Sequence, residues 1–187
     1  TVGAGVARAL LEKGRLLEQR IGARVVLRRV CDRDFRRSRG FRLSPALTTS
    51  DPSKIIRDPE IHIVVELIGG REPAKALILE AFRRGKHVVT ANKALLAHEG
   101  SELFKAATRA GVDLYFEASG GGGSPIIKAL REGLIANDLD TVLGIVNGTS
   151  NYVLSQMREK RLSFHEALLE AKHHGYAERN PSLDIDG

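Results

Sequence analysis

Short apolar runs alternate with longer amphipathic segments along the first two thirds of this chain, and this alternation constrains the fold more than any other feature. The runs are rich in Val, Ile and Leu, as buried strands are; they span Arg24–Cys31, Ile61–Ile68, His87–Ala91 and Val112–Ala118. Helical spacing of apolar residues covers Val6–Gln19, Pro73–Arg84 and Ala94–Ala110. Because strands separated by helices pair in parallel, the sequence predicts an α/β fold with a Rossmann-type, doubly wound parallel sheet.

The character of the sequence changes at Ser119, which precedes four consecutive glycines, Gly120 to Gly123. Beyond them the patterns predict helices over Ile126–Ile135, over Tyr152–Lys160 and after the capping box Ser163–Glu166, with a strand over Leu139–Val146 and a turn over Gly148–Asn151. We therefore expect two domains. Residues 1–118 form a dinucleotide-binding domain that lacks its first strand, and residues 119–187 form the first part of a second α/β domain.

Composition excludes several classes of protein. No apolar run approaches the roughly 18 residues of a membrane span, so we expect no membrane partner. The net charge of +6 invites a nucleic-acid hypothesis. No helix-turn-helix, zinc-finger or RNA-binding signature accompanies it, so we expect no nucleic-acid partner. The single cysteine, Cys31, excludes an internal disulfide and is typical of the reducing cytoplasm.

Lys93 follows the predicted strand His87–Ala91, and an Ala- and Leu-rich helical segment comes next. Thr90 and Asn92 supply turn and cap chemistry at this junction. The lysine therefore lies at the carboxyl end of a parallel strand, where open α/β sheets bind ligands. The alternative is a solvated lysine in the first turn of a helix.

Four further residues fit a dinucleotide site. The segment Thr1–Val6, which includes Val2, matches the tail of a G-x-G-x-x-G fingerprint with Gly3 as its third glycine, and in such a fingerprint a helix amino terminus faces the pyrophosphate. Gly69 would let the backbone approach a ligand closely, and Arg33 follows the strand end at which a cofactor 2′-phosphate lies. Ordinary glycine turns and a solvated basic loop explain the same residues without a ligand.

Two groups of oxygen-bearing residues have alternative interpretations. The carbonyls of Gly120–Gly123 together with Glu117 suit a hard cation, whereas a flexible hinge is the plain interpretation of four glycines. Glu178 and Asp184 lie six residues apart and suit the ammonium group of an amino-acid substrate. A solvated polar loop explains them equally well.

The motifs in this order resemble those of the homoserine dehydrogenase family, and the resemblance covers essentially the whole chain. The segments that carry it are Thr1–Val6, Val65–Gly70, Gly85–Leu96, Glu117–Ile127, Gly144–Tyr152 and Gly175–Asp184. Any one of these segments is weak alone, whereas their order and spacing together are specific.

The resemblance implies an oxidoreductase that interconverts L-homoserine and L-aspartate 4-semialdehyde with NADP or NAD, a step toward threonine, methionine and isoleucine. It implies that Lys93 is a catalytic residue that contacts cofactor and substrate, that Val2 and Gly3 lie on the cofactor phosphates, and that Gly69 lies beside the dinucleotide. Such an oxidation needs a hydride acceptor, which the cofactor provides, and a base for the hydroxyl proton, which a lysine can provide.

The same resemblance implies two further ligand sites. A monovalent-cation site, usually for sodium, is matched by Glu117 and the backbone carbonyls of Gly120, Gly122 and Ser124. A homoserine pocket is matched by Thr149, Tyr176, Glu178 and Asp184.

The chain departs from the family pattern in two ways. Gly120 and Ser124 stand where the family usually has bulky aliphatic residues. The chain also ends at Gly187, before a second lysine and a carboxylate of the family. We therefore expect a piece, truncated at both ends, of a longer enzyme that is typically a homodimer. The alternatives are a non-catalytic dinucleotide-binding fragment and another NAD(P)-dependent oxidoreductase of an amino-acid-derived aldehyde.

Overall fold

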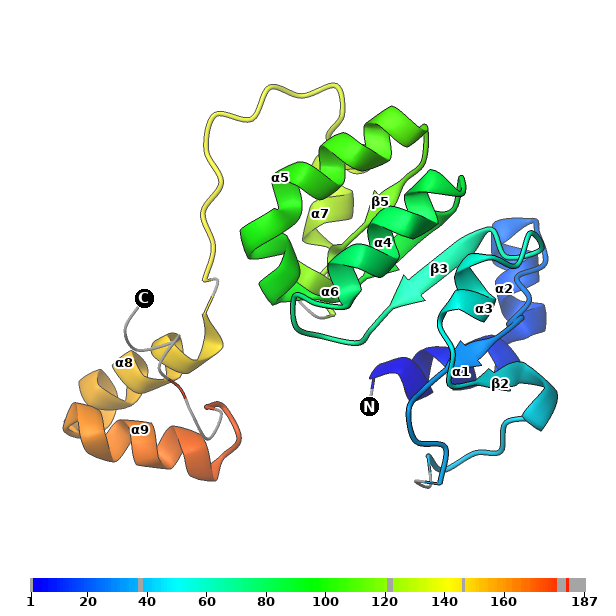
Figure 1. Cartoon of the computed structure of the whole chain (residues 1–187). Coiled ribbons are helices and arrows are strands. Elements are labelled where there is room, and N and C mark those ends of the chain that lie inside the picture. Colours follow the sequence, from blue (N-terminus) through cyan, green and yellow to red (C-terminus); the bar gives the residue numbers. More distant parts are fainter. Residues whose placement is uncertain (1, 37–38, 121–122, 146, 178–180, 182–187) are drawn as a thin grey trace. The chain divides into compact units, whose positions relative to one another are not determined.

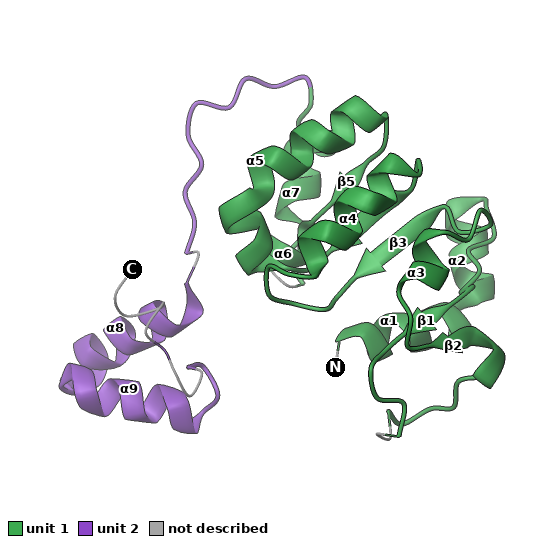
Figure 2. Cartoon of the chain, in the orientation of Figure 1, with its two compact units in different colours: residues 1–135 green, residues 136–187 purple. Residues whose placement is uncertain are grey.

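The computed structural model describes residues 2–36, 39–120, 123–145, 147–177 and 181. The chain divides into two compact units, residues 1–135 and residues 136–187 (Figure 2). Each unit has a hydrophobic core of its own.

The first unit is built around a three-stranded parallel sheet (Figure 1). Strands β3 (Ile63–Glu66), β4 (His87–Thr90) and β5 (Leu114–Tyr115) lie side by side in chain order. Helix α4 (Ala74–Arg83) connects β3 to β4, helix α5 (Lys93–Ala110) connects β4 to β5, and the two helices pack against each other. The predicted alternation of strand and helix is confirmed here.

Local sequence explains where helix α5 begins and ends. The Asn92 side chain accepts a hydrogen bond from the Leu95 amide and caps the helix start. Gly111 ends the helix with a φ of 66°, a left-handed conformation that glycine adopts at little cost. Apolar side chains of α4, α5 and β4 form the core, and each fully buried one contributes about 1.5–3 kcal/mol relative to exposure. The largest are Ile78, Phe82, Val88, Leu95 and Leu103.

A second parallel sheet contains two short strands, β1 (Val30–Cys31) and β2 (Thr48–Thr49). Helices α1 (Val2–Glu12) and α2 (Gly14–Ile21) precede β1, the 3₁₀ turn η1 (Pro45–Leu47) precedes β2, and helix α3 (Ser53–Ile56) follows β2. The α/β class with parallel strands is therefore confirmed, and among the described residues the strands are divided between two sheets.

Three predictions for the first unit were wrong in detail. The helix expected over Val6–Gln19 is two helices, because Lys13 leaves helical geometry (φ −110°, ψ 15°) just before Gly14. The strand expected over Arg24–Cys31 keeps two paired residues, Val30 and Cys31, which pair with β2. The strand expected over Val112–Ala118 shrinks to β5, because the chain turns into helix α6 (Glu117–Gly120).

Helix α7 (Ile126–Lys128) and the π-helical turn η2 (Ala129–Gly133) complete the first unit where one helix was expected. The strand predicted over Leu139–Val146 was wrong for its described residues, 139–145, which form neither strand nor helix. Val142, Leu143 and Ile145 are exposed there. An apolar run becomes a strand when a neighbouring strand accepts its hydrogen bonds, and the described part of the second unit, to which these residues belong, contains no strand.

The described part of the second unit contains two packed helices, α8 (Gly148–Lys160) and α9 (Phe164–His173). The capping box at the start of α9 is confirmed, since the Ser163 and Glu166 side chains each accept the other residue's amide. The expected turn at Gly148–Asn151 is instead the first turn of α8, and Asn147 caps it. No helix within the described ranges has the length and apolar content needed to cross a bilayer.

Candidate active site

The carboxyl ends of β3 and β4 meet at one edge of the sheet, and buried polar side chains gather there. Glu66 ends β3, Thr90 ends β4, and Asn92 follows two residues later. All three are almost completely buried, with Glu66 only 3% exposed. Polar groups buried in this way must be hydrogen-bonded or they cost stability, so their partners define the local structure.

The Glu66 carboxylate joins the two strand ends to the loop after β3. Its Oε2 accepts a hydrogen bond of 2.6 Å from the Thr90 hydroxyl. Its Oε1 accepts hydrogen bonds from the backbone amides of Ile68 at 2.7 Å and Gly69 at 3.3 Å. The Thr90 hydroxyl oxygen in turn accepts the Asn92 amide at 3.0 Å. The loop after β3 is therefore held in place by the strand beside it.

Asn92 fixes the same loop from the other side. Its Nδ2 donates to the Gly70 carbonyl at 2.7 Å, while its Oδ1 accepts the Leu95 amide at 3.1 Å. One side chain thus both tethers the glycine loop and caps the helix that begins with Lys93.

The glycine loop suits close approach by a ligand. Gly69 and Gly70 have φ values of 79° and 73°, which L side chains rarely adopt. A Cβ placed on Gly69 would meet nothing within 4 Å, so the space beside it is open. A Cβ on Gly3 would meet Leu67 Cδ1 at 3.7 Å, so the start of α1 lies beside this loop. Gly3 therefore lies beside Leu67, two residues before Gly69, and the exposed backbone of the loop fits a dinucleotide.

Lys93 is exposed at the first position of α5. Its backbone amide donates to the Ala91 carbonyl at 3.2 Å, and no described residue forms a hydrogen bond or ion pair with its ammonium group. The side chain is therefore available to a ligand at the strand edge.

The Asp32 corner, which we define as Asp32, Arg33, Asp34 and Arg39, lies at the end of β1. Arg33 is exposed there, as a residue that meets a phosphate must be. Asp32 pairs with Arg39 at 2.6 Å. The sequence patterns did not predict this pair, although an acidic residue directly after a Rossmann strand is a usable signal.

Glu117 has a second role besides the one expected of it. Its two carboxylate oxygens accept the amides of Ile127 at 2.9 Å and Lys128 at 2.8 Å, so it caps the short helix α7. Each oxygen keeps a further lone pair, so a hard cation remains compatible with this carboxylate.

The other residues expected at the cation site lie after Glu117 in the sequence. Gly120 is exposed on α6, and the Ser124 carbonyl accepts a hydrogen bond from the Ile126 amide at 2.9 Å. Gly122 lies outside the described residues. Among the residues that are described, no cluster of three acidic, His or Cys side chains suits a metal.

The second unit brings together two of the four expected substrate residues. The Thr149 hydroxyl donates to the Tyr176 carbonyl at 2.5 Å, and the Tyr176 ring stacks on Tyr152 with ring centroids 4.5 Å apart. Thr149 is buried and Tyr176 is exposed. Glu178 and Asp184 lie outside the residues that the structure describes.

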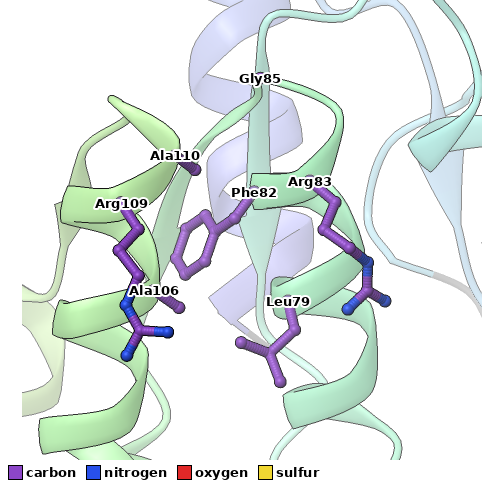
Figure 3. Close-up of a pocket in the computed structure, with 7 residues that line it drawn as sticks. All are labelled: Leu79, Phe82, Arg83, Gly85, Ala106, Arg109 and Ala110. Atoms are coloured by element: carbon purple, nitrogen blue, oxygen red, sulfur yellow. The ribbon is translucent and has the colours of Figure 1, made fainter.

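A hollow of about 570 Å³ lies elsewhere, between the carboxyl-terminal ends of α4 and α5 (Figure 3). Its lining is Leu79, Phe82, Arg83, Gly85, Ala106, Arg109 and Ala110. Gly85 precedes β4, so this hollow adjoins the amino-terminal edge of the sheet, opposite to Lys93. Ligands of open α/β sheets bind at the other edge, so we do not assign the site here.

A parallel α/β sheet with open glycine backbone and an exposed lysine at its carboxyl edge defines a dinucleotide-binding protein of the Rossmann type. Comparison with known families agrees. Residues 1–117 match the family model described as "Homoserine dehydrogenase, NAD binding domain", and residues 125–187 match the one described as "Homoserine dehydrogenase". The chain belongs to the homoserine dehydrogenase family.

Individual relatives show the same similarity. The chain is 44% identical over its whole length to a homoserine dehydrogenase of Neisseria gonorrhoeae, of which it covers 43%, and 40% identical to one of Bacillus subtilis, of which it also covers 43%. A crystal structure of a homoserine dehydrogenase from Thiobacillus denitrificans matches with a TM-score of 0.86 and 47% identity, over 98% of this chain and 42% of that one. A hyperthermophilic archaeal homoserine dehydrogenase in complex with NADPH matches with a TM-score of 0.64 and 31% identity, over 73% of this chain and 42% of that one. The chain therefore spans less than half the length of these relatives.

Proposed function

We propose that this chain supplies the cofactor domain, residues 1–118, and the first part of the catalytic domain, residues 119–187, of an NAD(P)-dependent homoserine dehydrogenase. The enzyme would interconvert L-homoserine and L-aspartate 4-semialdehyde on the way to threonine, methionine and isoleucine, as a cytoplasmic homodimer. The observation that carries the proposal is the exposed Lys93 side chain at the sheet edge that also holds the Gly69–Gly70 loop, in a chain of this family.

In the proposed oxidation, the nicotinamide ring supplies the acceptor for the hydride that leaves the hydroxyl-bearing carbon of homoserine. The hydroxyl proton would pass to Lys93 in its neutral amine form, which acts as general base and becomes the ammonium. Val2 and Gly3 at the start of α1 would face the cofactor phosphates. Arg33 would meet a 2′-phosphate.

The proposal assigns the substrate to four residues of the catalytic domain. Thr149 and Tyr176, already joined by the hydrogen bond between hydroxyl and carbonyl, would line the homoserine pocket. Glu178 and Asp184 would hold the substrate ammonium group, which orients the reacting carbon. Glu117 and the carbonyls of Gly120, Gly122 and Ser124 would hold the monovalent cation.

The role of Lys93 is tested by Lys93→Ala in the complete enzyme. Loss of a general base lowers kcat for homoserine oxidation by about a hundredfold or more, followed through the absorbance of the reduced cofactor. The matched control is Lys105→Ala, because Lys105 is an exposed lysine of the same helix. A Lys93→Ala enzyme with parental kcat would contradict the assigned role.

A dinucleotide-binding fragment without catalysis is the alternative, favoured by the coverage of only 43% of the relatives. Calorimetric titration of the 187-residue chain with NADP, followed by an assay with homoserine, separates the two. If this chain binds NADP without turning over homoserine and the complete enzyme does turn it over, the 187-residue chain is a dinucleotide-binding piece and the complete enzyme is the proposed dehydrogenase.

A further inference from the structure

Asp32 directly follows strand β1, and in Rossmann folds a residue at such a strand end contacts the cofactor ribose. Its amide donates to the Thr49 carbonyl at 3.2 Å, which holds it directly after β1. An acidic residue at such a position accepts a hydrogen bond from the ribose 2′-hydroxyl of NAD, whereas a nearby arginine accommodates the 2′-phosphate of NADP. This chain carries both residue types within one short segment.

The Asp32 carboxylate is already occupied. Its Oδ1 accepts the Asp34 amide at 3.1 Å, and its Oδ2 accepts Arg39 Nη2 at 2.6 Å. The Asp34 amide and the Arg39 guanidinium lower the pKa of Asp32, so the carboxylate stays charged and paired.

Arg39 is held on three sides. Its Nη2 also donates to the Asp34 carbonyl, and its guanidinium carbon lies 5.3 Å from the centre of the Phe35 ring. As a result the Arg39 side chain is only 18% exposed, while the Asp32 side chain is 43% exposed. Arg39 is therefore placed to neutralise Asp32. Arg33, the residue next to Asp32 in the sequence, is exposed and so remains accessible to a ligand phosphate.

We propose that the Asp32–Arg39 pair determines cofactor specificity: Arg39 neutralises the carboxylate that would otherwise favour NAD and repel a 2′-phosphate, and so permits NADP. The inference rests on the proposed dinucleotide site. It concerns which cofactor that site prefers, and Arg39 acts through Asp32 as a positioning residue.

The test uses adenosine 2′,5′-bisphosphate and adenosine 5′-monophosphate, which differ only at the 2′ position and carry no nicotinamide. Their affinities for the protein are measured by calorimetry, and the quantity compared is the ratio of the two dissociation constants. Arg39→Ala exposes an unpaired carboxylate beside the 2′ position. We expect the preference for the bisphosphate to fall by about tenfold, because two like charges at contact distance repel.

Arg36→Ala is the matched control. Arg36 belongs to the same segment and pairs with Asp34 at 3.1 Å, but its side chain is 93% exposed. Its removal changes the net charge equally and should leave the ratio unchanged. The double variant Arg39→Ala with Asp32→Asn should restore the parental ratio, since the repelling charge is gone.

An unchanged ratio in Arg39→Ala, an equal fall in Arg36→Ala, or a double variant that stays low would each overturn the inference. Asp32→Asn alone provides a second route if Arg39→Ala does not fold. It should raise the preference for the bisphosphate, and an unaltered ratio would again overturn the inference. A parental protein that binds neither nucleotide would contradict the proposed cofactor function itself. Binding of both nucleotides with a ratio of dissociation constants that no variant changes would contradict this inference alone.

Discussion

Two strand ends of the first unit carry polar residues that are organised in opposite ways. In the Glu66 corner, which we define as Glu66, Gly70, Thr90 and Asn92, a buried carboxylate is bonded to a hydroxyl and to backbone amides. In the Asp32 corner, opposite charges pair near the surface. Buried networks are little affected by salt, whereas exposed pairs are screened by it. The comparison indicates that buried hydrogen bonds hold the Glu66 corner in place, whereas the attraction between opposite charges holds the Asp32 corner.

The largest effect on stability is expected from Glu66→Leu. The variant leaves the amides of Ile68 and Gly69 and the Thr90 hydroxyl without their acceptor inside the protein. We expect the free energy of unfolding to fall by about 3 kcal/mol, measured by urea denaturation. Glu102→Leu is the control, because Glu102 is an exposed residue that pairs with Lys75 at the surface. Equal stability of the two variants would mean that the Glu66 corner is not organised by its carboxylate.

A smaller loss is expected from Asn92→Ala, which removes both the helix cap and the tether to Gly70. We expect about 1.5 kcal/mol in the same denaturation measurement. Asn92→Asp separates the two roles, since aspartate caps a helix as well as asparagine does but cannot donate to the Gly70 carbonyl. A variant Asn92→Asp as stable as the parent would show that the tether contributes nothing.

The smallest effect is expected from Asp32→Asn, at most about 1 kcal/mol near neutral pH, because the pair is partly solvated. The Asp34 amide and Arg39 hold the pKa of Asp32 below its ordinary value of 3.8. A carboxylate with a lowered folded-state pKa stabilises the protein above the unfolded-state pKa, and this stabilisation is lost as pH falls through the folded-state pKa. The stability difference between parent and variant should therefore vanish in acid and shrink in high salt. A difference that persists under both conditions would contradict the charge-balance account.

The sequence predicted the elements whose patterns are long and whose partners are close. β3, α4, β4 and α5 all fall within one or two residues of their predicted bounds or inside them, because β-branched runs and helical spacing coincide with buried faces. The strand expected over Leu139–Val146 failed because periodicity reveals an apolar face but not whether a neighbouring strand exists. Thr48–Thr49 was missed for the converse reason, since two polar residues carry no strand pattern yet find a partner in β1.

The site was predictable to a similar extent. Lys93 was placed at a strand end by the order of strand, turn and helix signals, and the structure places it there. The partners of Glu66 could not be predicted, because Thr90 lies 24 residues away and no local pattern joins them. Nor could the sequence say which of the clustered arginines pairs with Asp32, since no local pattern places Arg39, seven residues away, against that carboxylate and the Phe35 ring.

The double role of Asn92 has one more consequence. The amide that holds the glycine loop also begins the helix that carries Lys93, so both segments lose their conformational entropy when the chain folds. A ligand arriving at this edge then meets a surface that is already ordered. The free energy of binding is then not reduced by the entropic cost of ordering two separate segments.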